Sequence, residues 1–461
     1  MDKRIVDPRP TVVHKSALLE PAPITAERYI SRAWLDREQQ ALFPATWLFA
    51  CLERDVADPG EYQVFNIGDE SILVSRTQAG DLAAFYNVCQ HRGARVMVNA
   101  GGWVEKFICP YHGWAYACDG TLIQVPDAER FAEPVNFQER SLKPVRVDCI
   151  ADMVFVCMDD DAPELLDFLG PIAEAIAPYA LDKMTLIGDQ TVHLDCNWKA
   201  VFDNFGELYH VDHIHPQHEK MFNCPAAEIH LYDHGHTGVI IDGHTLNPRL
   251  PIPDKPNGYL AHQLKTFGAD PEDYNGRVLD IRLDLQTLRR ASGPRLGWDY
   301  SRMSDERLSD IEQYNLFPNT MITVQPDDAL IVRARPHPTD PDKCLWDKLT
   351  FHRYPDAQVA ANAGVGFAPN DAMGDSPNHR PEHDEFSQDD IIEGRKTMTI
   401  TIDQDIHLIR DVQAGMHSRG FTSQKLCDDE VRVQHYHDWL DYTLGARRSH
   451  QAGFVTPDED I

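Results

Sequence analysis

The sequence predicts an α+β fold in which a small all-β domain precedes a larger domain of mixed strands and helices. Between about Trp47 and Asp159, short apolar runs alternate with Gly and Asp turns, which is typical of β-structure. From Thr191 onward, strand-like runs are interleaved with segments of helical periodicity. The chain has 461 residues, which is enough for two domains that each bury a core.

The first part of the chain is predicted to be a helix followed by short strands. Residues 25–43 show an apolar stripe at helical spacing, and Thr25 is a suitable N-cap. Five strand-like runs follow, at residues 70–77, 81–88, 103–109, 113–120 and 151–158. We therefore expect an N-terminal helical segment over residues 1–45 that packs on the larger domain, an all-β domain over 46–160, and the larger domain over 161–461.

The second part is predicted to mix both kinds of element. Helices are expected over 198–210, 278–290, 403–417 and 429–444, and strands over 228–231, 238–241 and 345–353. Residues 321–336 have the pattern of a hairpin, with Pro326, Asp327 and Asp328 at its turn. Residues 355–390 are rich in Asn, Pro, Gly and Asp, and we expect them to form a long surface loop or lid.

Composition narrows the class of protein. The formal net charge of −30 disfavours binding to nucleic acid or to an anionic membrane surface, because both would repel the chain. No run approaches the roughly 18 to 20 apolar residues of a membrane span, and the N-terminal stretch is too polar for a signal peptide. Ten cysteines are scattered through the sequence and form no disulfide pattern. We therefore expect a cytoplasmic protein.

Two short motifs suggest a metal cluster in the all-β domain. Cys89 and His91 form the first, and Cys109 and His112 form the second. Two thiolates and two imidazoles can hold a structural zinc or a Rieske [2Fe–2S] cluster, in which the cysteines bind one iron and the histidines the other. A glycine follows each histidine closely, which suits loops whose backbone approaches sulfide, so the pattern favours iron–sulfur over zinc.

A second group of metal-capable side chains lies in residues 197–216, where His210, His213 and His215 stand close to Glu207. Two imidazoles and one carboxylate with open positions suit a mononuclear iron that activates O₂. In a regular helix His210 and His213 share a face, whereas His215 requires the helix to distort or end before Pro216. Helix geometry alone leaves both histidines open as the second ligand.

These stretches together resemble a known family. CQHRGARV and CPYHGWAY, followed by NWKAVFDNFGELYHVDHIHP, then DQDIHLIRDVQAG and VQHYHDWL, resemble the large (α) subunits of Rieske non-haem iron aromatic-ring-hydroxylating oxygenases. The resemblance implies a catalytic domain of the helix-grip, START-like type, with an antiparallel sheet wrapped by helices. It also implies a Rieske cluster on the four motif residues and one Fe(II) on His210, His215 and Asp405. Asp403 is the rival of Asp405, and His213 is the rival of His215.

The resemblance also assigns roles around the iron. Glu207 stands where the family has an acid that bridges to a Rieske histidine of the neighbouring subunit, although most ring dioxygenases carry Asp there. Asn204 is placed near the open side of the iron. The implied assembly is a homotrimer, with or without a small β subunit, served by a reductase or ferredoxin.

The implied activity is O₂-dependent hydroxylation of an aromatic or other hydrophobic small molecule, with dihydroxylation as the main expectation and electrons that come ultimately from NAD(P)H. The alternative is a monooxygenase or oxidative demethylase that acts on a quaternary ammonium or other non-aromatic substrate. An electron carrier without the second iron and a zinc-stapled binding protein are rivals from other classes. Pocket walls are expected from residues 201–250, 280–335 and 355–390, with Arg282, Arg289 and Arg333 as candidate anchors for a substrate carboxylate.

Overall fold

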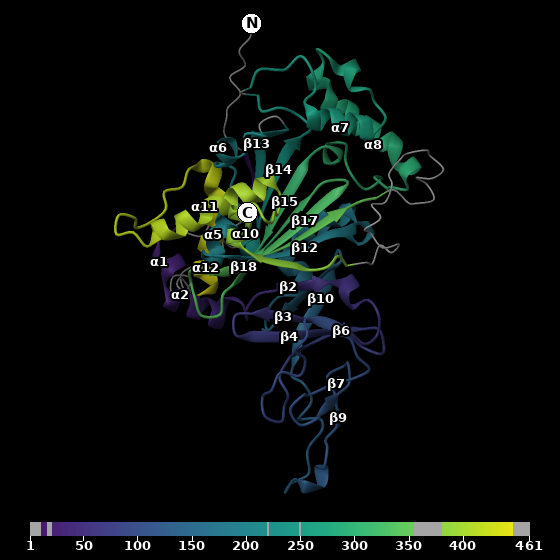
Figure 1. The fold of residues 1–461 in the computed structure, drawn as a ribbon, viewed down its shortest axis with the longest axis vertical. Helices are drawn as coiled ribbons and strands as arrows, with labels where there is room; N and C mark the ends of the chain where they lie inside the picture. Colours follow the sequence, from purple (N-terminus) through teal and green to yellow (C-terminus); the bar gives the residue numbers. More distant parts are fainter. Residues whose placement is uncertain (1–10, 16–20, 219–220, 249, 355–379, 446–461) are drawn as a thin grey trace, which may run out of the picture.

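The chain folds around two separate β-sheet systems, each with its own strand order. A computed structural model describes residues 11–15, 21–218, 221–248, 250–354 and 380–445. The smaller system lies at one end of the long axis and carries the β7–β9 region at its tip (Figure 1). The larger system, with the helices around it, forms the rest, so the predicted α+β class is confirmed.

The smaller system joins a seven-stranded sheet to a three-stranded one. The larger of these sheets has the order β2-β11-β10-β5-β4-β3-β6, and β7-β8-β9 forms the other. The bounds are β2 Leu48–Leu52, β3 Glu61–Ile67, β4 Glu70–Arg76, β5 Leu82–Tyr86, β6 Gly101–Trp103, β7 Phe107–Ile108, β8 Ala115–Tyr116, β9 Leu122–Gln124, β10 Pro144–Ile150 and β11 Met153–Cys157. The five predicted strand runs all contain strands, although those near residues 103–120 are shorter than expected.

The larger system is one nine-stranded sheet with the order β1-β13-β14-β15-β16-β17-β18-β12-β19. Only its two edge pairs, β1 with β13 and β12 with β19, are parallel in this sheet as described. The bounds are β1 Thr11–Lys15, β12 Thr185–Leu194, β13 Phe222–Leu231, β14 Thr237–Gly243, β15 Ile311–Leu316, β16 Thr320–Val324, β17 Asp328–Pro336, β18 Cys344–His352 and β19 Asp384–Ser387. The predicted hairpin is β16–β17, and its turn lies where Pro326 to Asp328 indicated.

Helices cover this sheet and place the site on it. Helix α5 packs against β17 and β18, α11 packs against α5, and α12 lies over β13 and β14. The bounds are α3 Leu165–Leu169, α4 Pro171–Ile176, α5 Trp198–Asn204, α6 Val211–Ile214, α7 Gly258–Thr266, α8 Ile281–Leu296, α10 Gln388–Ile392, α11 Ile400–Met416 and α12 Val431–Thr443. Within the described residues, no helix combines the length and apolar character that a bilayer span needs.

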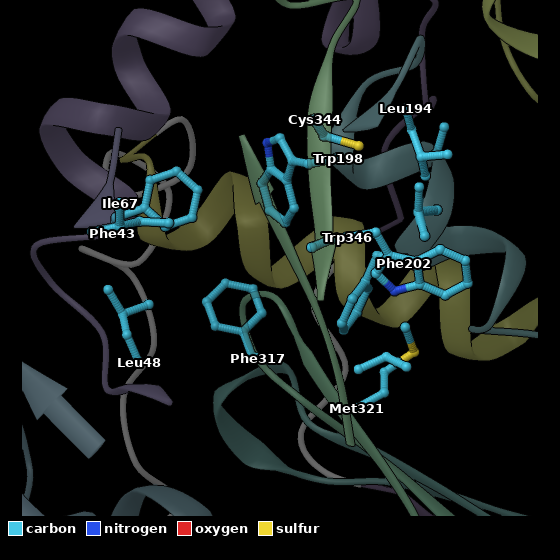
Figure 2. Close-up of a cluster of buried hydrophobic side chains, with 14 of the residues drawn as sticks. Phe43, Leu48, Ile67, Leu194, Trp198, Phe202, Phe317, Met321, Cys344 and Trp346 are labelled. Carbon is cyan, nitrogen blue, oxygen red and sulfur yellow. The ribbon is translucent and has the colours of Figure 1, made fainter. Parts of the chain in front are cut away.

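One apolar core connects the two sheet systems and the N-terminal segment. Figure 2 shows Leu48 and Ile67 of the smaller system in the same cluster as Trp198 and Trp346 of the larger one. The ring of Phe43 lies 5.4 Å from that of Trp198, centroid to centroid. Burying large apolar side chains stabilises a fold by about 1.5–3 kcal/mol each, so this shared core resists separation of the two systems.

Polar contacts also join the N-terminal segment to the larger system. Arg28 donates to Asp441 on α12 at 2.6 and 2.8 Å, and Lys199 on α5 pairs with Glu38 at 2.5 Å. Both pairs are buried, so each charge depends on its partner for compensation. Residues 28–43 are thus held against the α5 and α12 side of the larger system.

Two predicted helices are wrong in their extent. The predicted helix over residues 25–43 is interrupted at Ser31, whose ψ of 126° is extended, and divides into α1 Glu27–Ile30, α2 Arg32–Arg37 and the π-helical turn Glu38–Leu42. Thr25 caps nothing and instead forms a β-bridge with Ser423. The tertiary contacts of Arg28 and Tyr29 override local helix propensity here.

The predicted helix over 198–210 ends at Asn204, and α6 begins only at Val211. Part of the predicted surface loop is wrong as well, because residues 384–392 form β19 and α10. The remainder of that loop, residues 355–379, lies outside the described residues. Strand β12 was not predicted.

Candidate metal centres

Two loops of the smaller system repeat one hydrogen-bonding pattern. In the first, the Cys89 N–H donates to Ala94 O at 2.8 Å and the Gly93 N–H donates to Cys89 O at 3.0 Å. In the second, the Cys109 N–H donates to Trp114 O at 2.8 Å and the Gly113 N–H donates to Cys109 O at 3.0 Å. Each loop turns at its glycine, with φ of +77° and +70°, a conformation that other residues adopt only at a cost. We call residues 89–94 and 109–114 the cluster loops.

The cluster loops bring the four predicted cluster ligands together. The Cys89 and Cys109 side chains are buried, and the imidazole rings of His91 and His112 lie 4.5 Å apart at the edge of the domain. The Nδ1 atom of His91 is buried and has no hydrogen-bond partner among the described groups. Burial lowers the pKa of His91, so its ring is neutral at pH 7 and can bind a metal.

Aromatic side chains frame this centre on two sides. The indole of Trp114 stacks on His91 at 4.9 Å with an interplanar angle of 7°, and Trp114 itself is buried. Tyr111 packs on His112 at 3.8 Å but is 56% exposed, so it covers the histidine edge only partly. The hydroxyl of Tyr116, which was not predicted, lies 3.2 Å from Cys89 Sγ and accepts the Gln90 N–H at 3.0 Å. Such a hydroxyl can donate to a cysteine sulfur and tune a cluster.

The second centre forms where α5 ends, α6 is short and α11 passes behind them. His210 is the residue before α6, His215 is the residue after it, and Asp405 lies in α11. One ligand-type atom from each of the three lies within 4.8 Å of the other two. Asp405 Oδ1 is 3.2 Å from His215 Nε2 and 3.8 Å from His210 Nε2. The chain thus gathers two imidazoles and one carboxylate from residues almost 200 positions apart.

The helix break between Asn204 and Val211 has a local cause. The Glu207 carboxylate accepts the backbone N–H groups of Tyr209 and His210, which a continuing helix would have paired internally. The same carboxylate accepts from Nδ1 of His210. Glu207 thereby holds the chain in the turn between α5 and α6 and also fixes which nitrogen of His210 faces the centre.

Both rival residues lie outside this group. His213 is exposed, because α6 turns it to the surface and returns His215, with φ −115° and ψ 64°, to the interior. The carboxylate of Asp403 accepts the Met398 N–H at 2.8 Å and the Thr397 hydroxyl at 2.5 Å, at the start of α11. Asp403 therefore secures the turn that leads into α11 and is not directed toward the centre.

The geometry of the three residues fits a bound cation. Asp405 Oδ1 is buried without a hydrogen-bond donor, a costly state for a carboxylate that a metal would relieve. Nδ1 of His215 is held by Gln404 Oε1 at 2.8 Å, so its Nε2 faces Asp405. Burial lowers the pKa of His215, but the neighbouring Asp405 carboxylate and the Gln404 amide oxygen outweigh burial and raise it. Two imidazoles and one carboxylate are the donor set preferred by mononuclear iron(II).

A cavity of about 240 Å³ opens beside this centre. It is lined by Asn204, Phe205, Glu207, Leu208, His210, Val211, His215, His218, Phe222, Cys224, Ile241, Ile311, Gln313, Thr323, Gln325, Thr401 and Asp405. Most of these fall within the predicted ranges 201–250 and 280–335, and Asn204 lines the cavity as expected. His218, Gln313, Thr323, Gln325 and Thr401 were not singled out, since no motif marks single polar residues on segments that meet only after folding.

The three arginines considered as anchors for a substrate carboxylate do not line this cavity. Arg282 pairs with Asp310 at 2.5 Å, Arg289 with Asp327 at 2.9 Å, and Arg333 with Asp347 at 2.8 Å. Each is thus committed to an acid of the protein itself, and the prediction that they anchor a substrate is wrong for this cavity.

The chain has the features of a metalloprotein with two metal centres. One centre is formed by the cluster loops, and the other by two histidines and a carboxylate. Comparison with known families gives the same class. Residues 46–149 match the Rieske [2Fe-2S] domain, and residues 181–446 match the ring hydroxylating alpha subunit (catalytic domain). The chain belongs to the ring-hydroxylating alpha-subunit family. Its two domains imply a [2Fe–2S] cluster and a mononuclear iron in each chain.

Individual relatives carry different activities. The chain is 35% identical over 180 residues to the glycine betaine monooxygenase oxygenase subunit of Chromohalobacter salexigens, covering 39% of this chain and 40% of that one. It is 34% identical over 267 residues to the large oxygenase component of the naphthalene 1,2-dioxygenase system of Pseudomonas putida, covering 53% and 58%. The match thus spans between 40% and 58% of the length of these relatives.

Solved structures agree with the fold. A quaternary ammonium Rieske monooxygenase aligns with a TM-score of 0.64 at 18% identity, over 91% of this chain and 95% of that one.

Proposed function

We propose that this chain is a terminal oxygenase component. It uses O₂ and electrons from an NAD(P)H-dependent reductase or ferredoxin to hydroxylate an aromatic or other hydrophobic small molecule, with dihydroxylation as the main expectation. The single observation that carries this proposal is the buried group of His210, His215 and Asp405 at the wall of a cavity, in a chain that also carries the cluster loops.

The proposal gives each side chain a role. Cys89, His91, Cys109 and His112 would hold the [2Fe–2S] cluster, and His210, His215 and Asp405 would hold the iron. When bound, these groups supply one-electron transfer and activation of O₂, which no side chain supplies by itself.

The cavity beside the centre supplies the substrate site. Its walls are mainly apolar, with residues such as Leu208, Phe222 and Ile311. Such walls bind an apolar molecule and exclude water from the place where it reacts.

We also propose that Glu207 serves as the electron bridge and that the chain assembles as a homotrimer, with or without a small β subunit. The cluster loops border β7–β9 at one end of the molecule, whereas α6 and α11 belong to the other sheet system (Figure 1). Within one chain the two centres are therefore separated, and in the proposed trimer a neighbouring chain would supply the donor cluster. A homotrimer with cyclic symmetry is built from heterologous interfaces, in which different surfaces of neighbouring chains meet.

The division of the chain that this function requires is also a proposal. We divide the chain into an N-terminal segment over 1–45, a Rieske domain over 46–160 and a catalytic domain over 161–461. The two sheet systems and the contacts of residues 28–43 support this division.

The ten thiols are free, which suits the reducing cytoplasm that we expect for this protein.

The alternative proposal is monooxygenation or oxidative demethylation of a quaternary ammonium compound. It is supported by the likeness to the glycine betaine relative over about two-fifths of the chain. A quaternary ammonium is recognised chiefly by faces of aromatic rings. Phe205 and Phe222 line the cavity wall and could supply such rings.

The decisive experiment measures substrate-dependent consumption of NAD(P)H and O₂ by the iron-loaded protein with a surrogate reductase. Polycyclic hydrocarbons, aromatic acids and quaternary amines are tested in parallel, with the Asp405→Ala variant as the control for uncoupled consumption. Metal analysis of anaerobically prepared protein separates the rivals. Zinc would identify a stapled binding protein, and a red-brown chain with cluster iron alone would identify an electron carrier; either result overturns the proposal.

A further inference from the structure

A strip of neutral polar side chains forms part of the cavity wall. Gln313 lies on β15, Thr323 lies on β16, and Gln325 directly follows the last residue of β16. Gln313 is paired in register with Thr323, and side chains two apart on a strand point to the same face. Ile311, Gln313 and Asn315 therefore form one row on β15, of which the first two line the cavity and the third lies beyond it.

A buried arginine holds this row from behind. Arg432 on α12 is 1% exposed, and its Nη2 donates to Gln313 Oε1 and to Asn315 Oδ1, both at 2.9 Å. Its Nε donates to Thr237 Oγ1 on β14 at 3.2 Å. Among the described residues no carboxylate lies within ion-pairing distance of Arg432, and its Nη1 is buried without an acceptor. Burial lowers the pKa of Arg432 to about 9, so it remains charged at neutral pH.

This contact fixes which end of the Gln313 amide faces the cavity. A guanidinium has only donors, so Gln313 must turn its oxygen toward Arg432. The amide nitrogen then points away from Arg432. No group in the described part of the chain accepts a hydrogen bond from that nitrogen, and Gln313 stays partly exposed because it borders the cavity. Gln313 therefore offers two N–H donors that the protein itself leaves unused.

The charges around the cavity also favour an oxygen acceptor on the ligand. The Glu207 carboxylate already accepts from two backbone amides and from His210, and Asp405 belongs to the proposed iron site. Arg432 makes no ion pair among the described residues, and Glu207, whose charge partly offsets the effect of burial on the pKa of Arg432, is already engaged by these three donors. A positive charge at the wall disfavours a cationic ligand and favours an electron-rich oxygen.

We propose that Gln313 is a specificity-determining residue, held by Arg432 so that its amide N–H donates to an oxygen acceptor on an otherwise apolar substrate. This inference rests on the proposed oxygenase function and narrows its substrate class. The favoured substrates carry a carbonyl or comparable oxygen on an apolar ring system, in preference to bare hydrocarbons and to quaternary ammonium compounds. Arg432 is a positioning residue, because it acts only through Gln313.

The test compares two probes that differ in one oxygen, 1-indanone and indane. Their dissociation constants are measured by calorimetry on the anaerobic, iron-loaded protein without reductant, so that no turnover occurs. The wild-type protein is expected to bind 1-indanone about tenfold more tightly than indane, since one net hydrogen bond is of this order. Phenyltrimethylammonium, a cationic ring compound, is expected to bind more weakly than either.

Two variants of Gln313 and one matched control test whether its amide N–H is the hydrogen-bond donor. Gln313→Glu keeps an acceptor for Arg432 but removes the N–H donors, so the preference for 1-indanone should disappear while indane still binds. Gln313→Leu should have the same effect if it folds. Thr237→Val removes another acceptor of Arg432, at a position that does not line the cavity, and should leave the preference within about twofold of wild type.

The outcomes distinguish this inference from the proposed function. An equal affinity of the wild-type protein for both probes, or a preference that survives in Gln313→Glu, overturns the role of Gln313. Tighter binding of the ammonium probe than of 1-indanone overturns the substrate class. In either case, substrate-dependent O₂ consumption with indane would leave the oxygenase proposal standing. Discrimination without any O₂ consumption would instead refute the oxygenase proposal alone.

Discussion

Replacing Asp405 with Ala tests the iron site most directly, and Asp403→Ala is its matched control. The two carboxylates lie on the same helix, two residues apart, and one is the rival of the other. Asp405 contacts His210 and His215, whereas Asp403 accepts from Met398 and Thr397. The two substitutions should therefore affect different properties, although each removes one carboxylate from α11.

The expected magnitudes follow from these contacts. Removing a group that merely orients a metal ligand costs about 10–100-fold in affinity, so loss of a ligand should weaken iron binding by at least about 100-fold. If iron is supplied at about 1,000 times the wild-type dissociation constant, the stabilisation that it provides falls from about 4.1 to about 1.4 kcal/mol. Asp403→Ala should cost about 1–3 kcal/mol through its two lost hydrogen bonds, whether or not iron is present.

The assay measures chemical unfolding under anaerobic conditions with and without Fe(II), together with iron content after gel filtration. Asp405→Ala should lose the iron-dependent stabilisation and turnover and should keep the red-brown spectrum of the cluster. Asp403→Ala should keep the iron-dependent increment on a lower baseline. The ligand assignment is refuted if Asp405→Ala keeps its iron and its turnover, and it is reversed if Asp403→Ala loses them.

Three further substitutions test the surroundings. Glu207→Gln should retain both metals but slow transfer between them in a stopped-flow single turnover, because one oxygen acceptor is lost; an unchanged rate would exclude the bridge. His215→Ala should lose the mononuclear iron in metal analysis, and His213→Ala should keep it; the opposite result would restore the rival. Burial alone would raise the pKa of Asp347, but Arg335 and the neighbouring arginine on β17 outweigh it and lower that pKa. This contribution to stability is present above the unfolded pKa of about 4 and lost below it. Asp347→Asn should therefore destabilise by about 3–5 kcal/mol at pH 7 and less at pH 3, measured by denaturant titration; equal losses at both pH values would contradict the pairing.

The cluster loops could be predicted from the sequence because their chemistry is local. Each loop places a cysteine, a histidine and a glycine within five residues, and the loop closes on itself through the Gly93 or Gly113 N–H. A short closed loop leaves few arrangements for its side chains, so the spacing alone indicates the site. The strands that carry these loops could also be predicted from local sequence, because turn residues lie directly at both ends of each strand.

The second centre could be predicted only in part, because its geometry depends on where a helix stops. Periodicity predicts a continuous helix from Trp198 to His210, and within such a helix His213 would be the natural partner of His210. The helix instead ends at Asn204, and the Glu207 side chain holds the next turn by accepting the backbone amides of Tyr209 and His210. The apolar period continues past Gly206, a residue type that commonly follows a helix end, so the resemblance and not the period indicated His215.

The polar wall of the cavity lay beyond sequence reasoning for a different reason. Arg432 and Gln313 are 119 residues apart, and neither belongs to a motif. A buried arginine is expensive unless a folded structure supplies its acceptors, so its presence in α12 becomes informative only once those acceptors are known. Here they are amide and hydroxyl oxygens of β14 and β15 rather than a carboxylate. A carboxylate would have neutralised the guanidinium locally. Neutral acceptors leave the guanidinium charge behind the cavity wall. They also leave the amide nitrogen of Gln313 available to a ligand. The hydrogen bond from Arg432 to Gln313 therefore supports the wall and also influences which ligands bind.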